Sequence, residues 1–289
     1  MGGLKKIILP TLLVLFSGLS LCATIPVIER QALIALYNAT EGDNWKENTG
    51  WKTPPLHSDG FALPGTEDDW AGITILSDHV ANITLNNNHL SGTIPPILGD
   101  LEQLQVLNLG LNDLEGNIPP ELGRLLKLSS LDLFSNGLTG EIPAELGQLL
   151  NLLNLDLHDN QLSGRIPPEL GKLGNLFYLS LGENQFSESI PAELGRLFLL
   201  HEMIINKSEL IGQIPPELGK MSKLSRLDLS ENQLSGNIPS TLGSLGNLAS
   251  LELQDNRLTG GIPPELGKLS QLTSLDLYDN QLSGKIPPE

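Results

Sequence analysis

The sequence predicts an α/β solenoid, in which one chain coils into a curved stack of similar turns around a single apolar core. Two observations predict this fold. From about Ile83 onward, the chain of 289 residues repeats every 24 residues without an insertion, and a strict period of this length is the signature of a repeat architecture. Each repeat also alternates leucine with polar residues, which indicates a strand with one buried face.

Two sets of positions fix the period. Ile-Pro pairs recur from Ile94-Pro95 to Ile286-Pro287. Asparagine recurs in the same register, with Ser208 as the single exception, at Asn88, Asn112, Asn136, Asn160, Asn184, Asn232, Asn256 and Asn280. The unit reads L-x-x-L-x-L-x-x-N-x-L-x-G-x-I-P-x-x-L-G-x-L, which is the pattern of a leucine-rich repeat. We therefore expect nine repeats in residues 81–289.

Each part of the unit has a physical role. In the second repeat, Leu107 and Leu109 are predicted to point into the core, whereas Val106, Asn108 and Gly110 point outward. Strands of successive repeats then pair side by side, about 4.8 Å apart. The result is a parallel sheet that lines the concave face of the stack.

The recurring asparagine is predicted to end each strand. Its amide both donates and accepts hydrogen bonds, so it can satisfy backbone groups that the turn leaves unpaired. Stacked amides would form an Asn ladder. The glycine that follows permits a tight backbone, Ile-Pro favours an extended segment, and the "PPELGKL" part returns along the convex side as a short helical turn.

Residues 24–80 are predicted to form an N-terminal cap, because the ends of a repeat array need covering. "PVIERQALIALYNAT" is a modest amphipathic helix with Ile28, Ala32, Leu33 and Leu36 on one side. All three tryptophans, Trp45, Trp51 and Trp70, lie here. We interpret them as an aromatic plug, with sugar binding as the alternative. The sequence shows no evident C-terminal cap.

The first 23 residues predict export. A basic start with Lys5 and Lys6 precedes an apolar stretch, and "LCA" resembles a cleavage site after Ala23, as in a signal peptide. An uncleaved anchor is the alternative. Cys22 is the only cysteine, so the mature chain would have none. Its formal charge would move from −17 to −19, because two lysines leave. Such acidity argues against nucleic-acid partners, and no later segment is apolar enough to span a membrane.

The unit "LxxLxLxxNxLxGxIPxxLG" resembles the plant-type leucine-rich repeat of receptor-like kinase ectodomains and polygalacturonase-inhibiting proteins. The segments "ALIALYNATEGDNWKENTGW" and "DDWAGITI" are similar to the N-terminal cap of such proteins. The resemblance implies a right-handed superhelix, a short additional convex strand near Gly-x-Ile-Pro, and recognition of proteins, peptides or cell-wall glycans. The paired cysteines of plant caps are missing, which favours a bacterial or protist version.

The outward residues of the predicted sheet are the candidate binding site. Exposed aromatic and apolar side chains on a sheet are good anchors for a partner. Scattered surface variation is the alternative. The candidate residues are Asp132, Phe134, Asp156, His158, Tyr178, Ile204, Lys207 and Asp228. We expect a secreted or cell-surface recognition module without catalytic activity, cofactor or metal. A receptor ectodomain is the alternative, and a carbohydrate-active enzyme is disfavoured.

Three further interpretations of polar residues stay open. Asp132 and Asp156 on adjacent strands would suit a glycosidase pair, but nothing in the sequence marks either as a buried acid. A calcium site across these oxygens is a second reading, and a solvated acidic stripe is the third. Asn38, Asn82 and Asn206 begin glycosylation sequons. These matter only in a eukaryotic secretory pathway.

The repeats around Ser208 are the least regular. Glu188 stands where glycine is usual, and Met203 replaces leucine. Serine keeps a hydroxyl but loses the donors of the amide, so one rung of the ladder should weaken by about 1 kcal/mol. We interpret the substitution as a tolerated defect, with a partner contact near Ile204 and Lys207 as the alternative.

Overall fold

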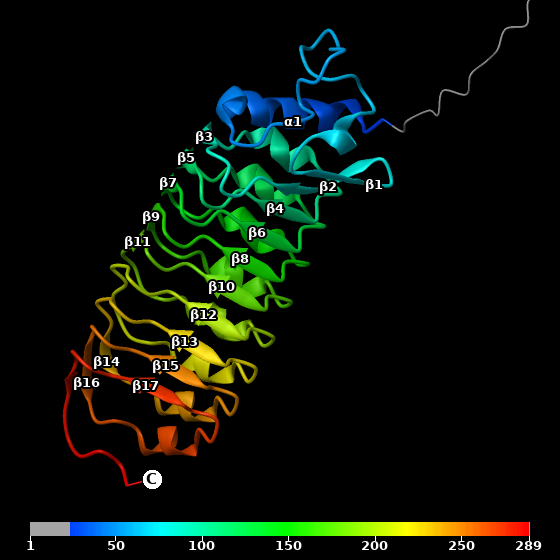
Figure 1. Cartoon of the computed structure of the whole chain (residues 1–289). Coiled ribbons are helices and arrows are strands. Elements are labelled where there is room, and N and C mark those ends of the chain that lie inside the picture. The colour runs from blue at the N-terminus through cyan, green and yellow to red at the C-terminus, as the bar shows by residue number, and fades with distance from the viewer. Residues whose placement is uncertain (1–23, 289) are drawn as a thin grey trace, which may run out of the picture.

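A computed structural model describes residues 24–288 and shows one elongated, curved stack (Figure 1). The helix α1 (Val27–Ala39) lies at one end, and the last repeat lies at the other. Each repeat contributes a strand to a long sheet, the first eight of the nine also contribute a 3₁₀ helix to the opposite side within the described residues, and most repeats add a second short strand. The predicted leucine-rich repeat solenoid with a concave parallel sheet is confirmed.

The concave face is one sheet of ten strands. Strands β1 and β2 pair antiparallel, and all later neighbours pair parallel. Leu131 pairs with Leu155, and Leu155 with Leu179, so the register advances by one repeat at each step. In order, the strands are β1 (Ile73–Leu76), β2 (His79–Thr84), β4 (Val106–Asn108), β6 (Ser130–Asp132), β8 (Asn154–Asp156), β10 (Tyr178–Ser180), β12 (Glu202–Ile204), β13 (Arg226–Asp228), β15 (Ser250–Glu252) and β17 (Ser274–Asp276).

The core lies between this sheet and the 3₁₀ helices. Leu155 and Leu157 on the sheet, and Leu170 on a 3₁₀ helix, are completely buried. Burying one leucine contributes roughly 1.5–3 kcal/mol. Every stacked repeat buries equivalent leucines, so this contribution recurs along the chain. Two further 3₁₀ helices, η1 (Gly42–Asn44) and η2 (Glu67–Asp69), belong to the cap. The helices of the array are η3 (Pro96–Asp100), η4 (Pro120–Arg124), η5 (Ala144–Gln148), η6 (Pro168–Lys172), η7 (Ala192–Arg196), η8 (Pro216–Lys220), η9 (Ser240–Ser244) and η10 (Pro264–Lys268).

The glycine of each "ELG" segment allows these helices to stack closely. A Cβ atom at Gly123 would lie 2.5 Å from the carbonyl oxygen of Glu145 in the next repeat. A side chain there would push neighbouring turns apart. The close spacing of the convex side therefore depends on glycine at this position.

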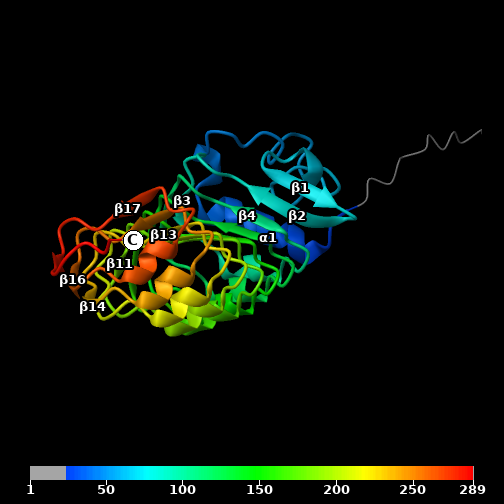
Figure 2. The ribbon, with the colours of Figure 1, turned by 90° about the horizontal axis from the view of Figure 1, so that it is seen from below.

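Additional short strands run along one flank of the stack, as Figure 2 shows for β11, β14 and β16. An additional strand near Gly-x-Ile-Pro is thus confirmed. The strands form two sheets rather than one. The first contains β3 (Ser91–Thr93), β5 (Asp113–Asn117), β7 (Gly137–Gly140), β9 (Gln161–Gly164) and β11 (Gln185–Phe186), and the second contains β14 (Ser235–Asn237), β16 (Arg257–Gly260) and β18 (Gln281–Leu282).

The flank is interrupted where the sequence is irregular. Gly164 and Gly212 have φ values of +74° and +80°, in the left-handed region that favours glycine. Glu188 occupies the equivalent position without a positive φ. Strand β11 ends at Phe186, and the next repeat makes only a single bridge, between Ser189 and Ile211. The concave sheet continues without a break across the same repeats.

The cap contains a buried aromatic cluster. Trp45, Trp51 and Trp70 are at most 5% exposed, and the ring centroids of Trp51 and Trp70 are 4.6 Å apart. These tryptophans therefore pack, as the plug interpretation predicted. The prediction for Ile28 is wrong: it is 43% exposed, because the buried face of α1 turns Arg30 toward the cap instead.

Candidate functional site

The concave site is the set of outward side chains Asp132, Phe134, Asp156, His158, Tyr178, Ile204 and Asp228, which the main sheet places on one face. Among them Asp228 is buried. Asp132 pairs in register with Asp156, and Ile204 pairs with Asp228. Tyr178 and Ile204 are half-buried and keep part of each side chain open to solvent. The alternation of the strands fixes this geometry, because their leucines occupy the opposite face.

An aromatic pair held by a carboxylate forms one part of the concave site. The rings of Phe134 and His158 stack with centroids 5.1 Å apart, and Nδ1 of His158 lies 2.6 Å from Oδ1 of Asp156. This hydrogen bond raises the pKa of His158, although burial opposes the shift. Gly110 makes room for the pair, since a Cβ atom there would lie 2.5 Å from Cε1 of Phe134.

The neighbouring acid has a different environment. Burial raises the pKa of Asp132, and a 2.8 Å hydrogen bond from the Ser130 hydroxyl partly offsets that effect. The structure therefore differs from the expectation that neither acid would be marked by burial. Burial also raises the pKa of the Tyr178 phenol.

A second cluster, Arg226 with Asp228 and Glu252, lies further along the sheet. Nε of Arg226 is 3.1 Å from Oε1 of Glu252, and Nη2 is 3.2 Å from Oδ2 of Asp228. The Ser230 hydroxyl donates to the other Asp228 oxygen at 2.6 Å. Burial raises the pKa of Asp228. Burial also opposes ionisation of Glu252, but hydrogen bonds from Arg226 and Ser250 outweigh the effect of burial and lower the pKa of Glu252.

Sequence reasoning singled out Asp228 but missed Arg226 and Glu252 as its partners. A signal was available, because Arg226 is the only lysine or arginine at the outward strand positions. Lys207 lies apart from the concave site: it follows β12 in the turn, where Nζ is 3.1 Å from Oε1 of Glu183. Within residues 24–288, no group of three or more His, Cys, Asp or Glu side chains is arranged to hold a metal ion.

The predicted Asn ladder is present. Nδ2 of Asn160 donates to the carbonyls of Leu157 and His158 in its own repeat, at 3.2 Å. The same amide donates to Leu133 of the preceding repeat at 3.1 Å and accepts from the backbone of Leu138 at 3.0 Å. Equivalent bonds recur from Asn112 onward at the ladder asparagines, whereas the side chain of Asn88 bonds the backbone of Glu47 in the cap. Each rung therefore joins two repeats.

At Ser208 the rung is lost. The hydroxyl oxygen lies 3.5 Å from the carbonyl oxygen of Asn206, at the limit of a hydrogen bond. In the part of the chain that the structure describes, no hydrogen bond joins this side chain to the preceding repeat. The weakened rung coincides with the interruption of the flank.

The three sequons differ in their surroundings. Asn38 is exposed at the end of α1, while the Thr40 hydroxyl of the same sequon is buried and donates to Leu36 at 2.7 Å. Asn82 and Asn206 are half-buried at the outward face of the main sheet. Their use for glycosylation stays a prediction.

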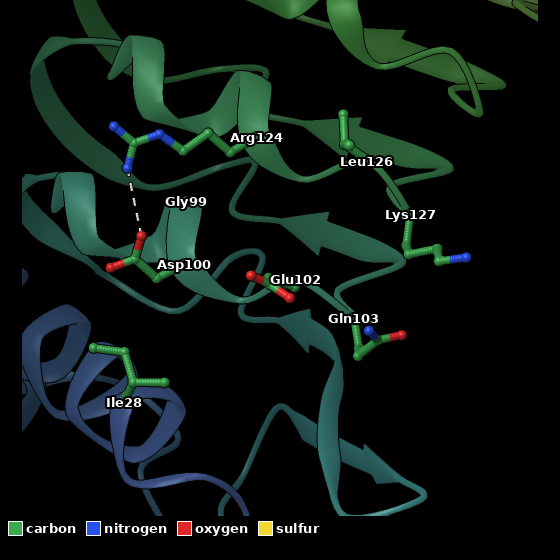
Figure 3. Close-up of a pocket in the computed structure, with 8 residues that line it drawn as sticks. All are labelled: Ile28, Gly99, Asp100, Glu102, Gln103, Arg124, Leu126 and Lys127. Carbon is green, nitrogen blue, oxygen red and sulfur yellow. Dashed lines mark hydrogen bonds and ion pairs between the residues drawn. The ribbon is translucent and has the colours of Figure 1, made fainter.

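A separate cavity of 560 Å³ lies beside the cap rather than on the concave face. Figure 3 shows its lining side chains, which come from α1, η3, η4 and the segments that follow these two 3₁₀ helices. Arg124 and Asp100 form an ion pair of 3.5 Å. The lining residues are Ile28, Gly99, Asp100, Glu102, Gln103, Arg124, Leu126 and Lys127. No helix in the described residues is long and apolar enough to cross a membrane.

Comparison with solved structures found plant relatives. The chain is 40% identical to the leucine-rich repeat ectodomain of the Arabidopsis thaliana receptor kinase GASSHO1/SCHENGEN3, solved with CASPARIAN STRIP INTEGRITY FACTOR 2, with a TM-score of 0.81. It is 32% identical to the Arabidopsis receptor kinase HAESA, solved with the peptide hormone IDA and the co-receptor SERK1, with a TM-score of 0.74. Both matches cover 90% of this chain, but only 30% and 42% of those chains.

A plant ice-binding protein matches over almost its whole length. Identity is 28% and the TM-score is 0.71, with 91% of this chain and 90% of that chain covered. A search of curated proteins found no match. Profiles described as leucine-rich repeats match residues 79–101, 103–125, 127–149, 151–173, 175–197, 199–258 and 271–289. The chain therefore belongs to the leucine-rich repeat family.

Proposed function

We propose that this chain is a non-catalytic recognition module that binds a protein or peptide on the concave site. The observation that carries the proposal is the stacked pair of Phe134 and His158, with Tyr178 and Ile204 on the following strands. Aromatic side chains that are rigid before binding lose little conformational entropy on contact. They are typical anchors of interfaces.

The similar structures support a peptide or protein ligand rather than a glycan. The GASSHO1/SCHENGEN3 and HAESA ectodomains were both solved with peptide or protein partners. This chain spans less than half the length of either receptor, so only the recognition of a polypeptide is carried over. We place the chain outside the cell, secreted or at the cell surface. The predicted signal peptide lies outside the described residues. A role as part of a longer receptor ectodomain is the alternative.

Selection from a library of short random peptides tests the proposal. The full chain is immobilised beside a Phe134→Ala/Tyr178→Ala double variant. Both substituted side chains lie on the outward face rather than in the leucine core, so the variant should still fold, and its unfolding midpoint is measured in parallel. We expect enriched peptides to bind the wild-type chain saturably and to lose at least about tenfold in affinity for the variant. Equal affinity for both proteins would place the site elsewhere.

Ice binding is the second candidate, because the plant ice-binding protein is a similar protein of matching length. Inhibition of ice recrystallisation by the purified chain is the direct measurement. Activity that survives the Phe134→Ala/Tyr178→Ala change would favour this candidate over peptide recognition on the concave site.

A further inference from the structure

Six large apolar side chains lie along the edge of the main sheet that is formed by the N-terminal ends of its strands. They belong to the segments that lead from the 3₁₀ helices into these strands. Each is 46–56% exposed. We call this set the apolar rim, and it consists of Leu126, Leu150, Leu153, Phe177, Phe198 and Leu199. Single exposed leucines are normal on proteins, but a group confined to neighbouring repeats marks an interaction surface.

The repeat itself does not require apolar residues at these positions. The position shared by Leu126, Leu150 and Phe198 is polar or glycine in the other repeats, at Glu102, Gly174, Ser222, Gly246 and Ser270. The position of Leu153 and Phe177 is equally variable, with Gln105, Ser129, His201, Ser225, Ala249 and Thr273. The fold forms around serine at either position. Core packing therefore does not explain the apolar rim.

The apolar rim is continuous with the concave site. The backbone N–H groups of Phe177 and Tyr178 both donate to the carbonyl of Leu153, at 2.8 and 3.0 Å. One strand thus carries a rim residue and a concave-site residue in succession. The Phe177 ring also stacks on His201, with centroids 4.0 Å apart, which fixes the aromatic at the edge.

The face of the main sheet on and around the concave site is acidic. Its outward carboxylates include Asp132, Asp156, Glu202 and Glu252, whereas Arg226 of the second cluster is already paired with two carboxylates. A complementary ligand brings positive charge to this face and apolar side chains to its edge. From Asp132 to Ile204 the sheet advances three strands, about 14 Å, which about four residues of an extended peptide span.

We infer that the ligand is a basic peptide whose apolar end crosses the edge of the sheet and packs on the apolar rim. This inference rests on the proposed function, and it adds the chemistry of the ligand and a second contact surface. Basic side chains meet the carboxylates around Asp132 and Asp156. Leucine or phenylalanine side chains of the peptide cover Leu153, Phe177 and Phe198.

Three synthetic peptides and the full chain test the inference by calorimetric titration. The first peptide has a lysine- and arginine-rich half followed by a leucine- and phenylalanine-rich half. The second replaces the apolar half with serine and glycine, and the third replaces the basic residues with glutamate. The rim variant is Leu153→Ser/Phe177→Ser/Phe198→Ser. The matched control is Leu76→Ser, which removes a leucine of similar exposure (51%) from the cap hairpin.

We expect the basic–apolar peptide to bind the wild-type chain and to lose about tenfold or more in affinity for the rim variant. The peptide without apolar residues should bind both proteins equally and weakly, and Leu76→Ser should change nothing. The inference is overturned if the rim variant binds the first peptide like the wild type. It is also overturned if the acidic peptide binds as tightly as the basic one, or if the basic–apolar peptide does not bind.

The Phe134→Ala/Tyr178→Ala variant separates this inference from the proposed function. Loss of binding in that variant, with an unaffected rim variant, keeps the concave site and removes the apolar rim. Loss of peptide binding in the rim variant alone overturns the proposal that the concave site anchors the ligand. Unfolding midpoints of all variants, measured in parallel, identify any loss of binding that comes from unfolding.

Discussion

Nδ1 of His158 lies 2.6 Å from Oδ1 of Asp156 on the same strand end, while the imidazole stacks on Phe134 of the preceding repeat. The carboxylate fixes the orientation of the ring, and the ring covers one face of the phenylalanine. The charge of Asp156 therefore affects the packing of His158 on Phe134, which joins two repeats.

The stability that His158 contributes should depend on pH. Its pKa is raised in the folded chain by the hydrogen bond to Asp156, above the ordinary value of about 6.5. The contribution is therefore fully present below pH 6.5 and is lost as pH rises through the folded-state pKa. We expect His158→Gln to cost more unfolding free energy at pH 5 than at pH 9, by at most about 1 kcal/mol because solvent screens the pair. Urea unfolding at both values measures this difference, and equal costs would contradict it.

Restoring the missing rung should stabilise the array. Ser208→Asn supplies the amide that joins two repeats at every other ladder position, with an expected gain of about 1 kcal/mol in unfolding free energy. Asn160→Ser is the matched reverse change and should lose at least as much, because it leaves the Leu133 carbonyl and the Leu138 N–H with one partner fewer. Urea midpoints of the two variants are compared with the wild type. A neutral Ser208→Asn would show that the break in the flank, rather than the side chain, determines the local geometry.

Removing Arg226 should leave two carboxylates without their shared donor. Asp228 is only 2% exposed, and a buried charge that loses its partner is costly. Because Arg226 itself is partly exposed, we expect Arg226→Gln to cost roughly 1–2 kcal/mol at pH 7. The cost should shrink at low pH, where the carboxylates are protonated. Arg257→Gln on the flank is the control, since this arginine is exposed and forms no ion pair within the described residues. Similar losses for both variants would argue against the cluster.

The cap should lose stability in acid. Burial opposes ionisation of Asp59, but hydrogen bonds from Arg30 and the Phe61 backbone lower its pKa to about 2. This stability is present above the ordinary pKa and is lost as pH falls toward 2. Because Asp59 is exposed and solvent screens its pair with Arg30, we expect Asp59→Asn to cost at most about 1 kcal/mol at neutral pH and little at pH 2.

Tryptophan fluorescence reports this loss selectively, because all three tryptophans lie in the cap. Asp68→Asn, at an exposed site in the same region, should leave the fluorescence transition unchanged. An acid transition that is identical in the wild-type chain and Asp59→Asn would refute the role of this carboxylate.

The sequence predicted the features that the period determines. The constant spacing predicts that Leu155 is buried, that Asp132 faces Asp156 in register, and that Asn160 bonds two repeats. It could not predict the partners of Arg226, because the direction of a long side chain depends on all its neighbours. Nor could it place Ile28, since a short amphipathic helix does not show which side the cap loops will cover. The effect of Glu188 on the flank required the backbone angles themselves.

Because the repeats are equal in length, the sequence position of an exposed side chain determines its position on the surface of the stack. Moving a residue 24 places along the sequence shifts it by one strand, about 4.8 Å, and leaves its facing unchanged. Exchange or duplication of whole units therefore slides, copies or deletes parts of a binding surface while the scaffold keeps its shape. A chain of this kind can acquire a new binding specificity by rearrangement of its own repeat units.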